Sequence, residues 1–145
     1  GNSKTETPTP EPAVKKESVT VKPTTDDVLA FLSYYTRTLL YGTYTDHAAL
    51  FDSQCDWEGT TYSSASMYSI ASNFYGGYST LEHSFNLLDA SFDSGGNATV
   101  TVTEYQRTRN KYSGAYASAS VKKRMLLNYY SGTFRISYVR TIATY

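Results

Sequence analysis

Residues 98–143 read ATVTVTEYQRTRNKYSGAYASASVKKRMLLNYYSGTFRISYVRTIA, and this stretch decides the fold class. Apolar and polar residues alternate over most of it, which is the period of strands with one buried face. Two short segments with turn chemistry, Ser113-Gly114 and Ser131-Gly132, divide it into strands over about 98–111, 115–130 and 133–143. Connections this tight predict an antiparallel meander.

A further strand is expected over about 80–93, joined to the meander by the turn Ser94-Gly95-Gly96-Asn97. Its apolar parity changes along its length, because Phe85 and Leu87 are odd-numbered whereas Ala90 and Phe92 are even-numbered. A β-bulge near Leu87-Leu88 would reconcile the two halves and bend the sheet.

Helices are predicted before the strands. Thr24 or Thr25 followed by Asp26 and Asp27 is typical of a helix start, because acidic side chains stabilise the positive end of the helix dipole. One apolar face then runs to Gly42, with Val28, Phe31, Leu32, Tyr35, Leu39 and Leu40 at helical spacing. A short helix from Thr45 to Phe51, with His47 exposed, and another over about 64–74 should follow. The expected fold is α+β, with N-terminal helices packed on a bent four-stranded antiparallel meander sheet.

Residues 1–24 have the composition of a flexible segment. They contain no aromatic residue, all four prolines of the chain and a mixture of Lys and Glu. Such a segment cannot bury enough apolar surface to offset the entropy lost on ordering. We therefore predict a disordered tether over 1–24 and a single domain over 25–145, with no apolar run of the roughly 18 residues that span a membrane.

Tyrosine and cysteine usage adds little about activity. The 15 Tyr suit a half-exposed sheet, a polar-lined cavity or an adhesive surface, because Tyr buries a ring but keeps a hydroxyl. Cys55 is the only cysteine, so it cannot form an internal disulfide, and we interpret it as a structural thiol. No residue spacing indicates a metal site, and we expect no cofactor.

Charged residues on the strands suggest a polar row inside the sheet. Two-residue hairpins would place Glu104 opposite Lys123 and Lys123 opposite Arg140, all on the core-facing side. Buried charges must be paired or hydrated. The row could lie at the open end of the sheet, where side chains reach water, or form the polar wall of a ligand pocket with His83 and Tyr138.

Charge is segregated although the whole chain is neutral. Residues 26–99 carry nine acids and one base, whereas residues 101–145 carry eight bases and one acid. On the expected register the outer face of the sheet is basic, with Arg107, Arg109, Lys122, Arg124 and Arg135. This face could bind an anionic surface such as lipid headgroups or a wall polymer, pair with another protein or a second copy of the chain, or remain solvated. No nucleic-acid-binding motif is present.

The order of elements resembles a known family. The stretch LLYGTYTDHAALFD (39–52), the following helix and the bent meander are similar to the nuclear transport factor 2-like cone. ATVTVTEYQRT (98–108) and YYSGTFRISYVRTI (129–142) resemble the extracytoplasmic C-terminal domains of teicoplanin-resistance-associated membrane proteins and related lipoproteins. The opening Gly-Asn-Ser-Lys resembles the residues after the lipid-modified cysteine of bacterial lipoproteins.

These resemblances imply a domain anchored to a membrane outside the cytoplasm, in a superfamily that includes isomerases, dehydratases and non-enzymatic binding modules. We expect a non-enzymatic cell-surface binding module. The alternative is a small-molecule isomerase or dehydratase with His83 and Glu104 as its acid and base, which would require a cavity in the cone where both side chains converge.

Overall fold

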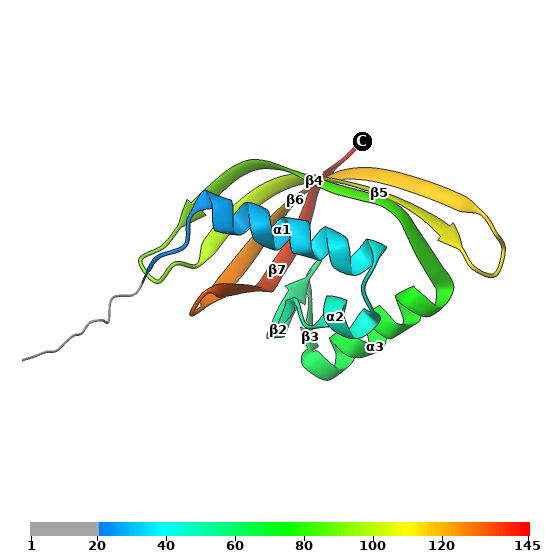
Figure 1. Ribbon diagram of the computed structural model, residues 1–145, viewed down its shortest axis with the longest axis horizontal. Helices are drawn as coiled ribbons and strands as arrows, with labels where there is room; N and C mark the ends of the chain where they lie inside the picture. Colours follow the sequence, from blue (N-terminus) through cyan, green and yellow to red (C-terminus); the bar gives the residue numbers. More distant parts are fainter. Residues whose placement is uncertain (1–20) are drawn as a thin grey trace, which may run out of the picture.

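The computed structural model describes residues 21–145, so most of the predicted tether lies outside the described residues. Three helices lie among six strands, and Figure 1 shows the sheet arching over the helices. The elements are α1 (Thr25–Leu40), α2 (Tyr44–Ala48), β2 (Phe51–Trp57), β3 (Thr60–Ser63), α3 (Ser64–Gly77), β4 (Tyr78–Phe92), β5 (Ala98–Asn110), β6 (Tyr116–Tyr130) and β7 (Thr133–Thr144).

Helix α1 begins where the acidic pair predicted. The backbone N–H of Thr24 donates to the Asp27 carboxylate at 2.7 Å, which satisfies one of the free donors at the helix start. The predicted apolar face is the buried one, with Val28, Leu32 and Tyr35 almost fully covered. Phe31 contacts Phe134 of β7 edge to face, so α1 packs into the hollow of the sheet.

The sheet has six strands in the order β3-β2-β7-β6-β5-β4, so the prediction of a four-stranded antiparallel meander is corrected. Strands β4 to β7 form the predicted meander. Strand β2 adds to it in parallel beside β7, and β3 pairs antiparallel with β2. Phe51 therefore begins a strand rather than ending a helix. In β2, FDSQCDW, the alternation of apolar and polar residues is interrupted at Ser53 and leaves only three apolar residues, a weaker signal than in the other strands.

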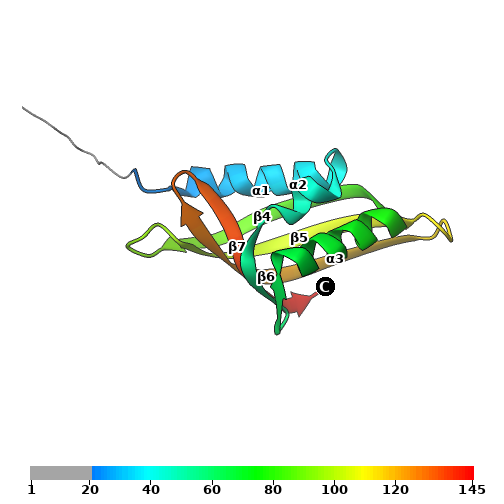
Figure 2. The ribbon, with the colours of Figure 1, turned by 90° about the horizontal axis from the view of Figure 1, so that it is seen from below.

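The meander bends where the sequence predicted a bulge. The pairing of β4 with β5 shifts between Leu87 and Asp89, and a second shift lies between Thr80 and Glu82. Bulges add local twist and curvature. Seen from below in Figure 2, α1 and α3 lie across the same face of the curved sheet. The result is a cone whose inner face is covered by helices.

The register of the meander differs from the prediction along the whole β5–β6 pair, and in the β6–β7 pair only beyond Ile136. The β5–β6 connection has five residues rather than two, so Glu104 lies opposite Val121 instead of Lys123. The β6–β7 turn does have two residues, with positive φ at Ser131 and Gly132. Beyond it, Ser137 is an extra residue in β7, because Ile136 pairs with Leu127 and Tyr138 with Leu126.

The packed domain begins slightly before α1. Pro23 is buried, and a Cβ on Gly96 would lie 2.8 Å from its Cδ and 3.0 Å from the Tyr129 ring. Gly96 has φ +88°, so glycine suits this position both in space and in backbone conformation. The segment assigned to the tether therefore makes contact with the domain at its last residues.

Candidate functional site

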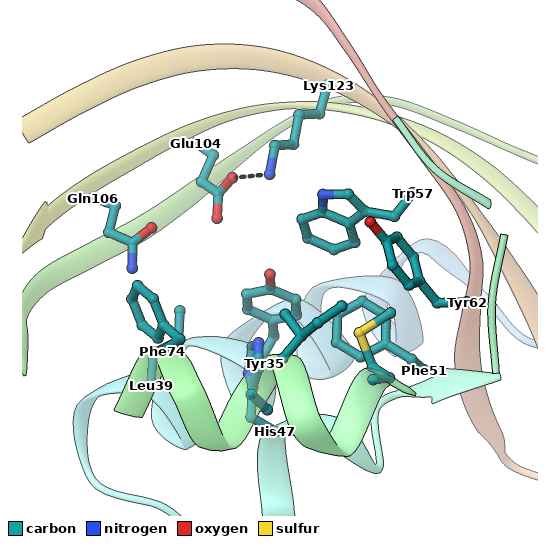
Figure 3. A pocket seen from close by; sticks show the side chains of 13 residues that line it. Tyr35, Leu39, His47, Phe51, Trp57, Tyr62, Phe74, Glu104, Gln106 and Lys123 are labelled. Atoms are coloured by element: carbon teal, nitrogen blue, oxygen red, sulfur yellow. Dashed lines mark ion pairs between the residues drawn. The ribbon is translucent and has the colours of Figure 1, made fainter. Parts of the chain in front are cut away.

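A cavity of about 240 Å³ lies inside the cone between the sheet and the helices. Its lining is mostly apolar, and every layer of the fold contributes to it (Figure 3). The apolar side chains are Leu39 of α1, Phe51 and Trp57 of β2, and Met67, Ile70, Ala71 and Phe74 of α3. The polar side chains are Tyr35, His47, Tyr62, Glu104, Gln106 and Lys123. An apolar cavity with a few convergent polar groups is typical of a small-molecule site.

Glu104 is the centre of the polar wall. Its Oε1 lies 2.7 Å from Lys123 Nζ, and its Oε2 lies 2.7 Å from His83 Nε2. Burial acts to raise the pKa of Glu104, but the hydrogen bond from His83 and the charge of Lys123 outweigh it, so the pKa is lowered. Glu104 is therefore a carboxylate held between two donors.

His83 connects this carboxylate to helix α1. A carboxylate only accepts hydrogen bonds, so His83 Nε2 carries a proton and donates a hydrogen bond to Glu104. The other ring nitrogen, Nδ1, lies 2.8 Å from Thr36 Oγ1. The ring also stacks on Tyr35, with centroids 5.5 Å apart. These contacts fix its orientation and hold it behind Glu104.

The second histidine of the chain, His47, lines the cavity, so the prediction that it is exposed is wrong. Thr38 Oγ1 donates to the carbonyl oxygen of Tyr35 at 2.7 Å, and it lies 2.9 Å from His47 Nδ1. Because the only hydroxyl proton of Thr38 is used for Tyr35, His47 Nδ1 must be the donor in the second bond. A neutral His47 ring then carries no proton on Nε2.

The charge state of His47 follows from its surroundings. Burial, and then the charge of His83, lower its pKa from 6.5 to about 4. At neutral pH the ring is therefore uncharged, and its Nε2 can accept a proton or a hydrogen bond. No other described residue makes a hydrogen bond to this nitrogen.

Tyr35 brings an unused hydroxyl into the same cavity. Its side chain is 4 % exposed, and no described residue forms a hydrogen bond with its hydroxyl group. Figure 3 shows the hydroxyl pointing from the helix side into the space between Glu104 and Trp57. Burial, and then the negative charge of Glu104, raise the pKa of Tyr35 well above its ordinary value, so it remains a donor. Because this hydroxyl opens onto the cavity and has no partner among the described residues, it is a candidate for ligand contact.

The structure separates the predicted polar row. Glu104 and Lys123 do contact each other inside the cone, and Lys123 also lies over the Trp57 ring at 5.1 Å. Arg140, in contrast, lies opposite Arg124 on the outer face, where it contacts Asp56 at 3.3 Å. Tyr138 lies on the same outer face beneath the Arg140 guanidinium. The extra residue in β7 turns the side chains of Tyr138 and Arg140 to the outer face of the sheet, so neither can contribute to the cavity.

The predicted basic residues share the outer face of the sheet. Arg107 lies opposite Ser118 and over the Tyr116 ring at 4.7 Å, while Arg109, Arg124 and Arg135 are exposed. Lys122 is half-buried in the same surface. Their proposed contact with an anionic surface stays a prediction.

The described residues offer neither a cluster of metal ligands nor a membrane-spanning helix. Within residues 21–145, no three His, Cys, Asp or Glu side chains gather closely enough to hold a metal ion. Among the three described helices, none is long and apolar enough to cross a bilayer. Cys55 is fully buried, and burial raises the pKa of its thiol to about 11.

Comparisons with known proteins support the fold. No family model and no curated protein matches the chain. Among solved structures, Aln2 from a Streptomyces species has a TM-score of 0.66 and 15% identity, covering 85% of this chain and 94% of that one. A ketosteroid isomerase-like protein from Erwinia carotovora atroseptica has a TM-score of 0.62 and 13% identity, covering 81% and 90%.

A hexachlorocyclohexane dehydrochlorinase has a TM-score of 0.64 and 16% identity, covering 84% of this chain and 90% of that one. These neighbours share the cone built from a curled sheet and packed helices. The narrower likeness to lipoprotein domains stays a prediction. The described part of the chain has the nuclear transport factor 2-like fold.

Proposed function

We propose that the domain binds a small, largely apolar molecule in the cone and catalyses proton transfer at a carbon next to an oxygen function. This is the isomerase or dehydratase type of chemistry. One observation carries the proposal: the unprotonated Nε2 of His47 and the unpartnered hydroxyl of Tyr35 line the same apolar cavity. A base and a hydrogen-bond donor in a mostly apolar cavity are the two groups that such a reaction needs.

In the proposed step, His47 Nε2 takes a proton from the carbon next to a carbonyl group. The electron pair of the broken C–H bond forms a C=C bond, and the carbonyl oxygen becomes an oxyanion. The Tyr35 hydroxyl donates a hydrogen bond to this oxygen as charge develops on it. In a substrate that carries a C=C bond next to the enolate, protonated His47 then gives the proton to the far carbon of that bond as the C=O bond re-forms, which completes an isomerisation. In a substrate with a leaving group on the β-carbon, the C=O bond re-forms, the C=C bond shifts to the β-carbon and the leaving group departs with the proton from His47, which completes an elimination.

Glu104 is poorly suited to be the base. Both of its oxygens already accept hydrogen bonds, from Lys123 and His83, whereas Nε2 of His47 is free of any partner among the described residues. We assign Glu104 and Lys123 to the electrostatics of the site, because they form the charged wall that a bound molecule would face, and His83 to holding Glu104 in place from behind. Gln106, on the same wall, offers a neutral hydrogen-bonding group for substrate orientation.

The structural neighbours make this chemistry reasonable for the fold. One is described as ketosteroid isomerase-like and another as a dehydrochlorinase. A shared fold alone does not transfer activity. The proposal therefore rests on the side chains of the cavity.

The test is solvent exchange at the carbon next to a carbonyl. Small cyclic ketones are incubated with the protein in deuterated buffer, and loss of the α-proton signal is followed by NMR. We expect exchange of at least one ketone above the buffer rate, lost in His47→Asn and reduced about 100-fold in Tyr35→Phe. Tyr68→Phe, on the exposed side of α3, is the matched control and should leave the rate unchanged.

The proposal fails if no ketone exchanges faster with the wild-type protein than with His47→Asn. It also fails if Tyr35→Phe and Tyr68→Phe behave alike. The expectation of a cell-surface module that binds through its basic outer face concerns a different surface, and both activities could exist in one domain.

A further inference from the structure

Part of strand β6 has an unpaired edge. Strand β7 ends at Thr144. The last hydrogen bond on the edge of β6 that faces β7 is donated by the N–H of Tyr145 to the carbonyl oxygen of Ser120. Among residues 21–145, no strand pairs with Tyr116–Ala119 on the side away from β5. Figure 1 shows the β5–β6 ribbon, in yellow, projecting beyond the rest of the sheet.

The unpaired backbone groups can be identified from two hydrogen bonds. The carbonyl of Ala115 accepts from Asn110 of β5, whereas the carbonyl of Ser120 accepts from Tyr145 on the opposite side. The register between them is continuous, so odd-numbered residues direct their N–H and C=O groups toward β5 and even-numbered ones away from it. The free groups therefore belong to Tyr116 and Ser118, with the N–H of Ser120 beside them.

This edge lacks the usual features that prevent strand addition. Tyr116–Ala119 carries no charge, no proline and no bulge, and all four residues are exposed. The other long edge of the sheet, β4, has two bulges and carries the exposed Glu82 and Asp89. Exposed edges are commonly protected by charges, proline or bulges. The contrast marks the β6 edge as available for pairing.

The side chains around the edge define what could pair with it. On the outer face, Arg107 and Arg109 lie opposite Ser118 and Tyr116, so the surroundings are basic. On the inner face, Ala117 and Ala119 lie opposite Thr108 and Gln106 and leave room for larger side chains. An added strand would thus favour acidic residues on its outward side and apolar residues on its inward side.

We propose that this edge binds an extended segment of a partner protein by β-strand addition. The segment alternates acidic and apolar residues, and its backbone pairs with Tyr116 and Ser118. Backbone hydrogen bonds provide the affinity, and the two faces provide the selectivity. The site is separate from the proposed catalysis, because its hydrogen-bonding groups lie on the backbone outside the cavity.

The probe is a fluorescein-labelled peptide of alternating Glu and Val, seven residues long, titrated with the 145-residue chain and followed by fluorescence anisotropy. A peptide of alternating Lys and Val is its control. Ser118→Pro removes one free N–H without removing a bond to β5, so the ladder remains intact. We expect at least a tenfold loss of affinity for Ser118→Pro and less than a twofold change for Ser118→Ala.

Two further measurements make the result decisive. Circular dichroism and the thermal midpoint show whether Ser118→Pro is folded, and Arg107→Ser with Arg109→Ser should weaken binding and flatten its salt dependence. Equal affinity for both peptides, equal binding by both Ser118 variants, or no binding by folded wild-type protein overturns the proposal. A dimer in sedimentation that Ser118→Pro converts to monomer would make a second copy the occupant and would overturn the assignment to a partner protein.

Discussion

The pKa of His47 gives a prediction that needs no substrate. In the unfolded chain the ring takes up a proton as the pH falls below its ordinary pKa of about 6.5. In the folded protein it resists protonation until about pH 4. The unfolded state therefore binds more protons between these values, so the free energy of unfolding must decrease as the pH falls through this window.

The size of the effect follows from the two pKa values. At pH 5 the unfolded ring is about 97 % protonated and the folded ring about 10 %, so the loss of stability relative to pH 7 is about 2 kcal/mol. The buried carboxylate Glu104 contributes little between pH 7 and pH 5, because the ordinary pKa of a glutamate lies below this range. Its lowered pKa stabilises the protein above the unfolded value, and that contribution is lost only at lower pH.

The assay is urea unfolding followed by Trp57 fluorescence at pH 7 and pH 5, for wild type and His47→Asn. The asparagine amide can still donate a hydrogen bond to Thr38 Oγ1, but it does not gain or lose a proton between pH 7 and pH 5. The decrease in unfolding free energy between the two pH values should be about 2 kcal/mol smaller in the variant, whatever its absolute stability. Equal decreases in the two proteins would show that folded His47 titrates as it does in the unfolded chain, and this would refute the argument that burial lowers its pKa.

Three other predictions concern the cavity and the outer face. Tyr35→Phe should not lower the free energy of unfolding in the same urea assay, because the Tyr35 hydroxyl has no described partner. Tyr75→Phe should lower it by about 1 kcal/mol, because this variant loses the 2.5 Å hydrogen bond to the Thr38 carbonyl oxygen. Lys123→Met should lower the free energy of unfolding by roughly 3 kcal/mol, since it leaves Glu104 buried with His83 alone. Lys122→Met on the outer face should lower it by less than about 1 kcal/mol. Similar decreases in the two variants would show that Lys123 reaches water at the open end of the sheet. If the outer face binds anionic surfaces, the chain should sediment with anionic but not with neutral vesicles, and less of it should sediment at high salt. Replacing Arg107, Arg109, Lys122 and Arg124 by Ser should abolish this sedimentation. Equal, negligible sedimentation with both kinds of vesicle would show that the outer face is an ordinary solvated surface.

The sequence predicted the parts of the fold that depend on local periodicity. The acidic start and apolar face of α1, the four strands of the meander and the bulge near Leu87 all follow from the spacing of side chains within one segment. Strands β2 and β3 were missed because their sequence is polar. The position of β2 depends on pairing with β7, which lies some eighty residues further along the chain.

The predicted polar row shows that the face on which a side chain lies can be predicted correctly even where the pairing register of the strands is not. A five-residue connection shifted β5 against β6 by two positions, which preserves the face of every side chain, so Glu104 and Lys123 still meet as diagonal neighbours. One extra residue at Ser137 changes the face of the residues that follow it as far as a second register shift at Ile142, and Arg140 and Tyr138 therefore lie outside. No sequence pattern at Ser137 marked the bulge.

The sequence by itself determined that helices precede a curved sheet and that Glu104 and Lys123 face its interior, because helical and strand periods are local properties. Only the tertiary structure decided where the two histidines lie and what protons they carry. His47 lies on a short helix that is polar in sequence, and it reaches the cavity because α2 packs between α1 and α3. Its missing proton depends on Thr38, and its low pKa depends on burial and on His83, groups that only folding brings together.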